Sequence, residues 1–483
     1  MGEPKRWGSR IRRLRRQAKL SQTELAKRLG ISVSYLNMIE HDRRPLSAPL
    51  LVELAQVLEI DLTSFGADDE QRLLGDLMEV FGDALFEQSD ILNVEVRELV
   101  QANPAVARSV LTLYRAYRAS RKRVEDLSVH LAAEDGGHGH QPHAAEAHDE
   151  VAELIQRHGN HFPQLEAGAS ALVEAARLDP TDMYQGLADY LRDSHGIQTQ
   201  IRQVGEMQGA IRRFDPDAGR LELSEVLRRG SRNFQLAYVA GLMSQGQILD
   251  RFAADPHLSN ESSRALCRVA LGNYFAAAVL MPYGAFYEAA LDVRYDIELL
   301  GHRFRTSIEQ VCHRLTTLRR PGESGVPFHV VRTDIAGNIS KSFSATGMRF
   351  ARFSGACPRW NVFRAFLTPG RYRVGLSTMP DGTTFFEVAL TVQRESRGYL
   401  APQPIQAVGV GCHVEQAREL VYSDGIDLEN LDSATPIGIA CRLCDRMDCE
   451  ERAFPPIQYP MRIDEHLRGV SFYTPVGGPR ADS

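Results

Sequence analysis

A succession of short helices, each with its own start signal, constrains the first part of this 483-residue chain more than any other feature. Ser21 is followed three residues later by Glu24, the reciprocal capping pattern that begins a helix. Gly30 ends that helix, and Ser32 is placed to cap the next one. Because apolar residues recur at helical spacing on both sides, residues 7–62 predict a compact set of four or five helices.

Residues 20–61 resemble the lambda-repressor-like, XRE-type helix-turn-helix over their whole length. The resemblance implies that the second helix of the pair lies in the major groove of double-stranded DNA. A small helical protein-interaction domain is the alternative. The expected base-reading residues are Ser32, Ser34, Tyr35 and Asn37, and the expected phosphate contacts are Gln22, Arg43 and Arg44.

The charge is distributed as a DNA reader requires. Residues 1–65 hold 12 Lys and Arg against 7 Asp and Glu, a balance of +5; the total is −6, so the remainder carries −11. A basic N-terminal segment in an otherwise acidic chain is typical of a DNA-binding module joined to domains that do not bind DNA. No apolar run is long enough to cross a bilayer, and none follows the basic N-terminus, so we expect a cytoplasmic protein.

Residues 104–133 carry apolar side chains at alternating intervals of four and three, the spacing of a coiled-coil. We expect a helix that pairs two copies, because helix-turn-helix proteins commonly bind two half-sites. An amphipathic helix packed on its own chain is the alternative. The residues of this heptad stripe are Val106, Val110, Leu113, Tyr117, Val124, Leu127 and Leu131, with Ser120 in the one gap. The Gly- and His-rich segment 136–148 reads as a linker, although such tracts can also bind metal.

Residues 145–300 read as helices, a few short strands at 197–202, 209–214 and 221–223, and then longer helices. The order of these elements and their residue patterns resemble the ImmA/IrrE-type zinc peptidase domain, in which an H-E-x-x-H helix precedes an F-A-A-E-x-L-M-P helix. The second motif matches through Pro282. The positions of the zinc ligands and of the general base hold Tyr238, Val239, Leu242 and Ala278, none of which suits either role. The resemblance therefore implies a peptidase fold without peptidase chemistry.

Taken together, these parts and a cysteine-bearing tail resemble one family over nearly the full chain: the short-chain fatty-acyl-CoA-responsive transcriptional regulators of propionate, methylcitrate or glyoxylate-pathway genes. The resemblance implies a regulator without enzymatic activity, whose former peptidase cleft binds an acyl-CoA such as propionyl-CoA. Arginines suit the CoA phosphates, and tyrosines suit adenine or the acyl pocket. The candidates are Arg202, Arg212, Arg213, Arg229, Arg232, Tyr238, Tyr274 and Tyr283. Solvated surface roles for the arginines and core packing for the tyrosines are the alternatives.

The C-terminal region begins with strand-like alternation at 326–332, 372–377 and 385–393, which predicts a small sheet. Four cysteines with a C-x2-C core then form a metal signature. The lone first cysteine and the four-residue gap favour a [4Fe–4S] cluster; zinc and unliganded thiols are the alternatives. The expected ligands are Cys412, Cys441, Cys444 and Cys449, with Cys357 as a possible substitute for one of them.

We therefore expect a multidomain, mainly α-helical chain with α+β parts. The predicted domains are a helix-turn-helix at 1–66, a helical dimerisation spacer at 67–135, a linker at 136–148, an ImmA/IrrE-like α+β domain at 149–302, a helix and small sheet at 303–400, and a small β-containing cysteine domain at 401–483. Two other functions stay open: an iron–sulfur regulator that senses redox state, and a zinc peptidase that cleaves a regulatory partner.

Overall fold

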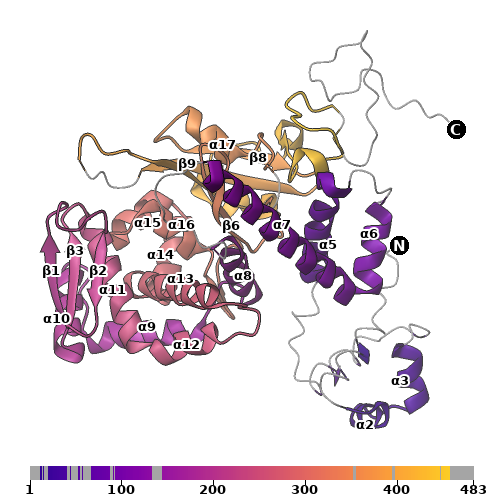
Figure 1. Cartoon of the computed structure of the whole chain (residues 1–483), viewed down its shortest axis with the longest axis horizontal. Helices are drawn as coiled ribbons and strands as arrows, with labels where there is room; N and C mark the ends of the chain where they lie inside the picture. The colour runs from indigo at the N-terminus through magenta and orange to yellow at the C-terminus, as the bar shows by residue number, and fades with distance from the viewer. Residues whose placement is uncertain are drawn as a thin grey trace. The chain divides into compact units, whose positions relative to one another are not determined.

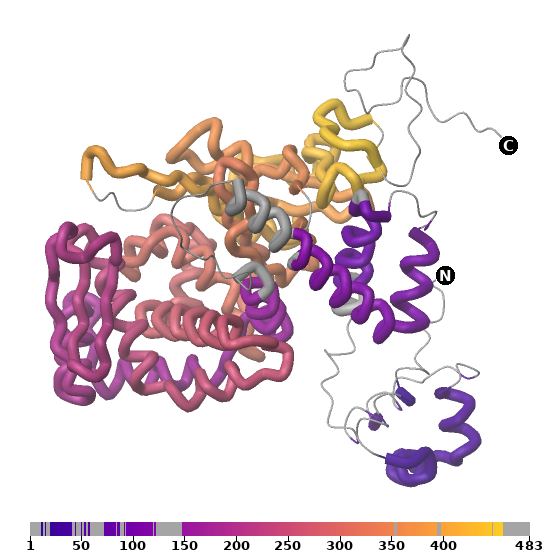
Figure 2. Tube along the Cα trace, viewed as in Figure 1, coloured from indigo at the N-terminus to yellow at the C-terminus, as the bar shows by residue number. Residues whose placement is uncertain are grey.

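The computed structural model describes residues 20–40, 67–86, 93–132, 144–351, 355–393, 398–446 and 448–456, with isolated positions between residues 11 and 91. The chain divides into two compact units, residues 1–113 and 114–483 (Figures 1 and 2). Unit 1 is helical in its described part, and unit 2 combines helices with two sheets and a short hairpin. The predicted fold class, a multidomain and mainly α-helical chain with α+β parts, is confirmed.

Unit 1 begins with the predicted pair of short helices. The hydroxyl of Ser21 accepts a hydrogen bond from the Glu24 amide at 3.1 Å, and the Glu24 carboxylate accepts one from the Ser21 amide at 2.8 Å, which completes the capping box. The described helices of this unit are α2 (Gln22–Arg28), α3 (Val33–Glu40), α5 (Ala67–Phe81), η2 (Ala84–Phe86) and α6 (Asn93–Ala102), followed by α7 (Pro104–Ala132), which continues into unit 2.

Helix α7 presents two different faces. Ala107, Leu111 and Tyr114, spaced by one and two turns, are buried. Val106 and Leu113 of the heptad stripe are instead 49% and 73% exposed. The face of α7 that packs on its own chain therefore lies beside the predicted stripe. Val106 and Leu113, on the stripe itself, are exposed. The side chains of Val124 and Leu127 lie outside the described residues.

The first half of unit 2 is a helical layer with a three-stranded sheet at one end (Figure 1). Strand β3 (Arg220–Ser224) lies between β1 (Gln198–Arg202), which is parallel to it, and β2 (Arg212–Asp215), which is antiparallel. Helix α13 (Glu261–Leu280) packs against five other helices and forms the centre of the layer. The remaining helices are α8 (Ala144–Arg157), α9 (Pro163–Ala175), α10 (Met183–His195), α11 (Arg229–Ser244), α12 (Gly246–Ala253), α14 (Tyr283–Asp292), α15 (Ile297–Phe304) and α16 (Ile308–Leu315).

The second half of unit 2 is built on a six-stranded sheet of order β11-β8-β9-β10-β6-β7. Its strands are β6 (His329–Asp334), β7 (Ile339–Ser344), β8 (Arg373–Thr378), β9 (Thr384–Gln393), β10 (Ile405–His413) and β11 (Thr435–Pro436). Because β10 pairs with both β9 and β6, the domain boundary predicted at residue 400 falls inside one sheet. Helix α17 (Asn361–Arg364) packs on the sheet, and a short hairpin of β4 (Arg319–Arg320) and β5 (Glu323–Ser324) precedes it.

The helical half contains a fully buried ion pair. Arg314 on α16 donates two hydrogen bonds to the carboxylate of Glu166 on α9, at 2.6 and 2.9 Å, and a third to the Met281 carbonyl oxygen at 3.0 Å. The hydroxyl of Tyr274 on α13 donates to the same carboxylate at 2.6 Å. Three helices are therefore joined by a polar network in which every partner compensates the burial of another.

In the part of the chain that the structure describes, no single helix is long and apolar enough to cross a membrane. Helices α13 and α14 meet that test only as a bent pair, and they supply side chains to the cores of unit 2.

Candidate functional site

Helix α3 carries the predicted base-reading residues. Ser34 and Asn37 are exposed and Tyr35 is half-buried, while the Ser32 hydroxyl accepts a hydrogen bond from the Tyr35 amide at 3.1 Å and so helps to begin the helix. Gln22 donates to the Asn37 side-chain oxygen at 3.4 Å, which links the start of α2 to the middle of α3. Arg44 is exposed, and Arg43 lies outside the described residues.

Glu40, at the end of α3, was not predicted to support this DNA-binding surface. Glu40, whose side chain is buried, accepts two hydrogen bonds from Arg15 at 2.7 and 3.0 Å and one from Gln22 at 3.0 Å. The hydrogen bonds to Glu40 raise the pKa of Arg15, although burial acts against them. Since Glu40 follows Leu36 by one turn, its position in phase with a core residue was the available signal.

The residues at the predicted zinc-ligand and general-base positions lie in the helical core of unit 2. Tyr238, Val239 and Ala278 are buried in one apolar cluster, and Leu242 packs at its edge. The Tyr238 ring fits because α13 has a glycine beside it: a Cβ at Gly272 would lie 2.8 Å from the ring. None of these side chains is a usual ligand of a zinc ion.

The structure brings two of the predicted effector residues together. The Arg212 guanidinium lies 3.9 Å above the centre of the Tyr238 ring, a cation–π contact. Arg212 also donates to the Gln235 side-chain oxygen, one turn before Tyr238, at 2.9 Å. This group of Arg212, Gln235 and Tyr238 joins the small sheet to helix α11.

The other predicted arginines bind acceptors of their own chain. Arg202 and Arg213 both contact the Glu222 carboxylate, at 3.1 and 3.4 Å. Arg229 contacts Asp182 at 3.3 Å. A phosphate at these positions would have to compete with a carboxylate. Arg232 donates to the Glu225 carbonyl oxygen at 2.8 Å.

The two remaining predicted tyrosines serve packing in the structure. Tyr274 donates its hydroxyl to buried Glu166, as described above, and burial raises its pKa. The Tyr283 hydroxyl accepts from the Arg320 amide at 2.7 Å and donates to the Glu323 carbonyl oxygen at 2.9 Å. Their hydroxyl groups thus hold helices and the β4–β5 hairpin in place, which is the packing alternative considered for them.

The cysteines are grouped differently from the prediction. Cys412 lies on β10 opposite Phe386, in a core where burial raises its pKa to about 12 and where Glu419 and Glu415 are its charged neighbours. Cys357 instead lies in another core cluster, where its amide is bonded to Ile439 and the next residue back, Gly438, lies against the Cys444 thiol. Cys357, and not Cys412, is therefore the cysteine that lies near the later ones.

This cysteine group comprises Cys357, Cys441, Cys444 and Cys449. The amide of Cys357 donates to the Ile439 carbonyl oxygen at 3.0 Å, so the two segments are directly bonded. Four thiols are the donor set that zinc and iron–sulfur clusters prefer. Within the described ranges, however, no three His, Cys, Asp or Glu side chains are arranged around a single metal position.

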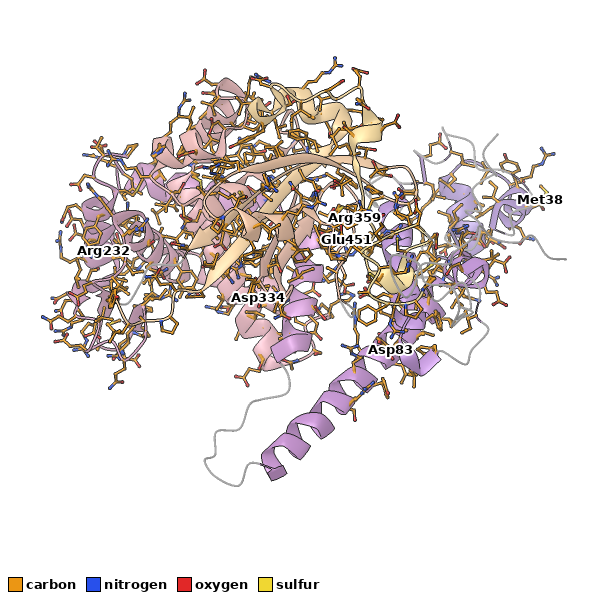
Figure 3. The ribbon with its side chains drawn as sticks, turned by 90° about the horizontal axis from the view of Figure 1, so that it is seen from above. Met38, Asp83, Arg232, Asp334, Arg359 and Glu451 are labelled. Atoms are coloured by element: carbon orange, nitrogen blue, oxygen red, sulfur yellow. The ribbon has the colours of Figure 1, made fainter. Side chains whose placement is uncertain are left out.

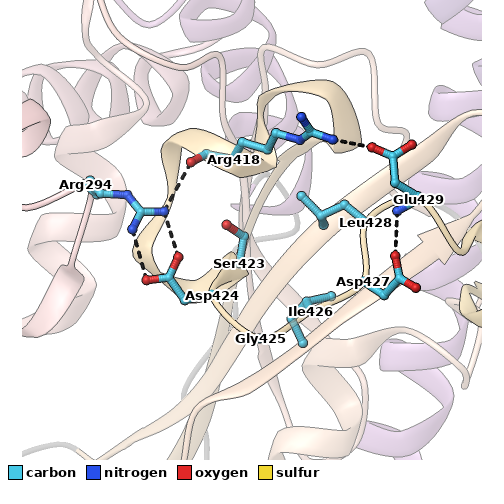
Figure 4. Close-up of a pocket in the computed structure, with 9 residues that line it drawn as sticks. All are labelled: Arg294, Arg418, Ser423, Asp424, Gly425, Ile426, Asp427, Leu428 and Glu429. Carbon is cyan, nitrogen blue, oxygen red and sulfur yellow. Dashed lines mark hydrogen bonds and ion pairs between the residues drawn. The ribbon is translucent and has the colours of Figure 1, made fainter.

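A separate polar pocket of about 420 Å³ contains none of the predicted residues (Figure 4). Arg294 binds both oxygens of Asp424 at 2.9 Å, and Arg418 pairs with Glu429. Because these charges pair with one another, we interpret them as joining the α14–α15 connection to the segment after β10, and not as a ligand site.

Three protein-family models match successive parts of the chain. A helix-turn-helix model matches residues 11–65, an IrrE N-terminal-like domain model matches residues 192–316, and a model described as the C-terminal part of a short-chain fatty acyl coenzyme A regulator matches residues 317–473.

Curated relatives match almost end to end. The HTH-type transcriptional regulator RamB of Mycobacterium tuberculosis is 38% identical over 96% of this chain and 98% of its own length. PrpR of the same organism is 38% identical over 95% and 93%. A propionyl-CoA carboxylase regulator of Cereibacter sphaeroides is 37% identical over 96% and 98%. A solved Mycobacterium tuberculosis transcriptional regulator superposes with a TM-score of 0.65 at 38% identity, over 67% of this chain and 98% of that one.

Proposed function

The chain belongs to the short-chain fatty acyl coenzyme A regulators, a family of helix-turn-helix transcriptional regulators, and from this membership we propose that a short-chain acyl-CoA sets its affinity for operator DNA. The family members are regulators, so the chain is a regulator and not an enzyme. We assign it to the cytoplasm and to genes of short-chain fatty acid metabolism, such as propionate or acetate use.

The DNA contacts follow from the exposed surface of α3. Ser32, just before α3, and Ser34, Tyr35 and Asn37 on the helix read base edges. Gln22 stands beside Asn37 and, with Arg43 and Arg44, contacts phosphates. The buried carboxylate of Glu40 supports this surface, because it accepts hydrogen bonds from both Arg15 and Gln22 and so fixes their positions.

One observation supports the effector proposal: the chain matches the IrrE-type domain model, while Tyr238, Val239 and Ala278, at the predicted positions of two zinc ligands and the general base, are buried in an apolar cluster. We assign the effector to the region where the half-buried Arg212 lies over the buried Tyr238 ring. The further contacts are Arg202, Arg213, Arg229 and Arg232, with Tyr274 and Tyr283 supporting the site from the core.

Propionyl-CoA is expected to raise the melting temperature of the full chain and to change its affinity for operator DNA. Substitution of Arg212 by alanine should weaken this response about 10- to 100-fold in ligand concentration, because a charge-assisted hydrogen bond to phosphate contributes about 1.5–3 kcal/mol. Thermal melts over a range of propionyl-CoA and free CoA concentrations measure the effect.

Arg220, an exposed arginine on the neighbouring strand, provides the matched control. R220A should respond like the wild type. Equal responses from R212A and the wild type would remove Arg212 from the site, and the absence of any shift with short-chain acyl-CoA would contradict effector control itself.

We further propose that two copies associate through the heptad stripe of α7. The exposure of Val106 and Leu113 supports this, since two turns of a helix rarely present large apolar side chains to water without a partner. A dimer would place two reading helices at the two half-sites of an operator.

The cysteine group supports a second proposal, that Cys357, Cys441, Cys444 and Cys449 hold a [4Fe–4S] cluster, with zinc as the alternative. Four thiolates suit either group. The hydrogen bond from the Cys357 amide to Ile439, in the segment that leads to Cys441, favours this set over one that includes Cys412, which lies in a different core. A regulator that follows redox state through this cluster is the alternative function.

A comparison of C357S with C412S tests the cluster proposal. Protein reconstituted anaerobically with ferrous iron and sulfide should lose most of its iron and its absorbance near 400 nm in C357S, because one of four ligands is removed. C412S should keep both, since Cys412 lies in another core. Iron loss in C412S with retention in C357S would reverse the assignment, and stoichiometric zinc without sulfide would replace the cluster by zinc.

A further inference from the structure

A series of hydrogen bonds leads from the core of the helix-turn-helix to one of its exposed side chains. Glu40, at the end of α3, is only 4% exposed, and its Oε2 atom accepts a hydrogen bond from the side-chain nitrogen of Gln22 at 3.0 Å. The same nitrogen donates to the Asn37 side-chain oxygen at 3.4 Å. Asn37 is exposed on α3, one residue before Met38, which is labelled in Figure 3. One glutamine therefore connects a buried carboxylate to a residue of the DNA-binding surface.

An ion pair holds the Glu40 carboxylate in place. Arg15 donates to its two oxygens from two different nitrogens, at 2.7 and 3.0 Å. A third nitrogen of Arg15 donates to the Leu20 carbonyl oxygen at 3.1 Å. Because a bidentate arginine–carboxylate pair fixes the orientation of both groups, Glu40 presents its Oε2 atom to Gln22 in a defined position.

The carboxylate also determines how the two amide side chains are oriented. An ionised carboxylate only accepts hydrogen bonds, whereas a side-chain amide has a donating nitrogen at one end and an accepting oxygen at the other. Glu40 therefore selects the nitrogen end of Gln22, and this nitrogen in turn selects the oxygen end of Asn37. Since the two ends of an amide point in different directions, the nitrogen of Asn37 is turned away from Gln22.

We propose that Gln22 is a positioning residue for sequence recognition: it orients the Asn37 amide so that its nitrogen donates to an acceptor on a base edge in the major groove. The inference rests on the DNA contacts proposed above. Guanine presents two acceptors at this edge and thymine one, whereas cytosine presents an amino group. The base pair that Asn37 reads should therefore favour guanine and disfavour cytosine. Without Gln22 the amide can turn over, and its oxygen then accepts from the amino group of cytosine or adenine.

The test selects duplexes from a randomised DNA pool with the full chain and with the variants Q22A, N37A and Q22A/N37A. N37A is expected to lose about tenfold or more in the preference for one base at a single operator position. Q22A should lose about 3- to 10-fold at the same position, because it binds duplexes with the wrong base more tightly and not because it binds the best duplex less tightly. In the double variant, Q22A should cause no further loss, since Gln22 acts through Asn37.

The control is T23A, which changes the exposed residue next to Gln22 and should select the same sequences as the wild type. Q22A leaves the Arg15–Glu40 pair intact, and circular dichroism melts check the fold of each variant. A loss of affinity in Q22A that is equal for every duplex would make Gln22 a phosphate contact alone and overturn its positioning role. Losses of Q22A and N37A that add in the double variant would overturn it as well.

Two further outcomes concern the DNA contacts on which the inference rests. If N37A selects the same sequences as the wild type, Asn37 does not read a base, and the base contact proposed for it fails together with the inference. A wild-type chain that selects no sequence from the pool would contradict sequence-specific DNA binding itself. If N37A loses its preference while Q22A keeps it, the base contact stands and only the role of Gln22 fails.

Discussion

Replacement of Glu166 by alanine is expected to lower the free energy of unfolding of unit 2 by about 3–5 kcal/mol. The change leaves the Arg314 guanidinium buried without its carboxylate, and it also removes the acceptor of the Tyr274 hydroxyl. Urea unfolding followed by circular dichroism measures the loss. Glu174, exposed on the same helix α9, provides the control, and E174A should change stability by less than about 0.5 kcal/mol.

The double variant E166L/R314M separates the cost of an unpaired charge from the value of the pair. Because a buried ion pair stabilises little beyond apolar side chains of similar size, the double variant should be much more stable than E166A. If E166A and E174A unfold at the same urea concentration, the pair has no structural role.

The same pair predicts a dependence on pH. Burial raises the pKa of Glu166, but the charge and hydrogen bonds of Arg314 lower it by more, so the folded-state value lies below the ordinary one. A carboxyl whose pKa is depressed by folding stabilises the fold above its unfolded pKa, and this contribution is lost as the pH falls through the folded value. The difference between the wild type and E166A should therefore be largest near pH 7 and should narrow below about pH 4.

Substitution of Leu113 by aspartate is expected to weaken self-association more than about 100-fold. An aspartate in the middle of an apolar helix pair would be buried without a partner, at a cost of about 3 kcal/mol or more, and each 1.4 kcal/mol corresponds to a factor of ten. Operator binding should fall with it, because a single copy reads only one half-site. Sedimentation of the full chain and binding to operator DNA measure both effects.

The neighbouring residue provides the control for this experiment. Thr112 is exposed and lies off the heptad stripe, with its hydroxyl bonded to the Arg108 carbonyl oxygen. T112D introduces the same charge one position away and should associate like the wild type. A dimer that survives L113D would move the interface to another surface.

Features encoded over a few residues could be predicted from the sequence. The start of α2 could be predicted from Ser21 and Glu24, because the side chain of each accepts a hydrogen bond from the backbone amide of the other within one turn. Helix α3 and the strands β1 and β9 likewise agree with the predicted ranges. Such signals need no knowledge of the rest of the chain, since the partners lie within hydrogen-bond reach along the sequence.

Features that depend on distant partners could not be predicted in this way. Strand β10 was not predicted because Gly409 and Gly411 weaken the strand pattern; in the sheet, a Cβ at Gly411 would lie 2.6 Å from the His329 ring. Glu166 meets Arg314 across 148 positions. The fold brings Cys357 close to the other cysteines, and their spacing in the sequence does not indicate this. Cys412 is closer to them in sequence, but its side chain lies in a different core.

The bare backbone of Gly272 against the Tyr238 ring couples these two positions to each other. With 2.8 Å between the ring and the place of a Cβ, even an alanine at 272 would force a shift in this contact. Because the Arg212 guanidinium lies over the same ring, a displaced ring would also disturb the link between the small sheet and helix α11.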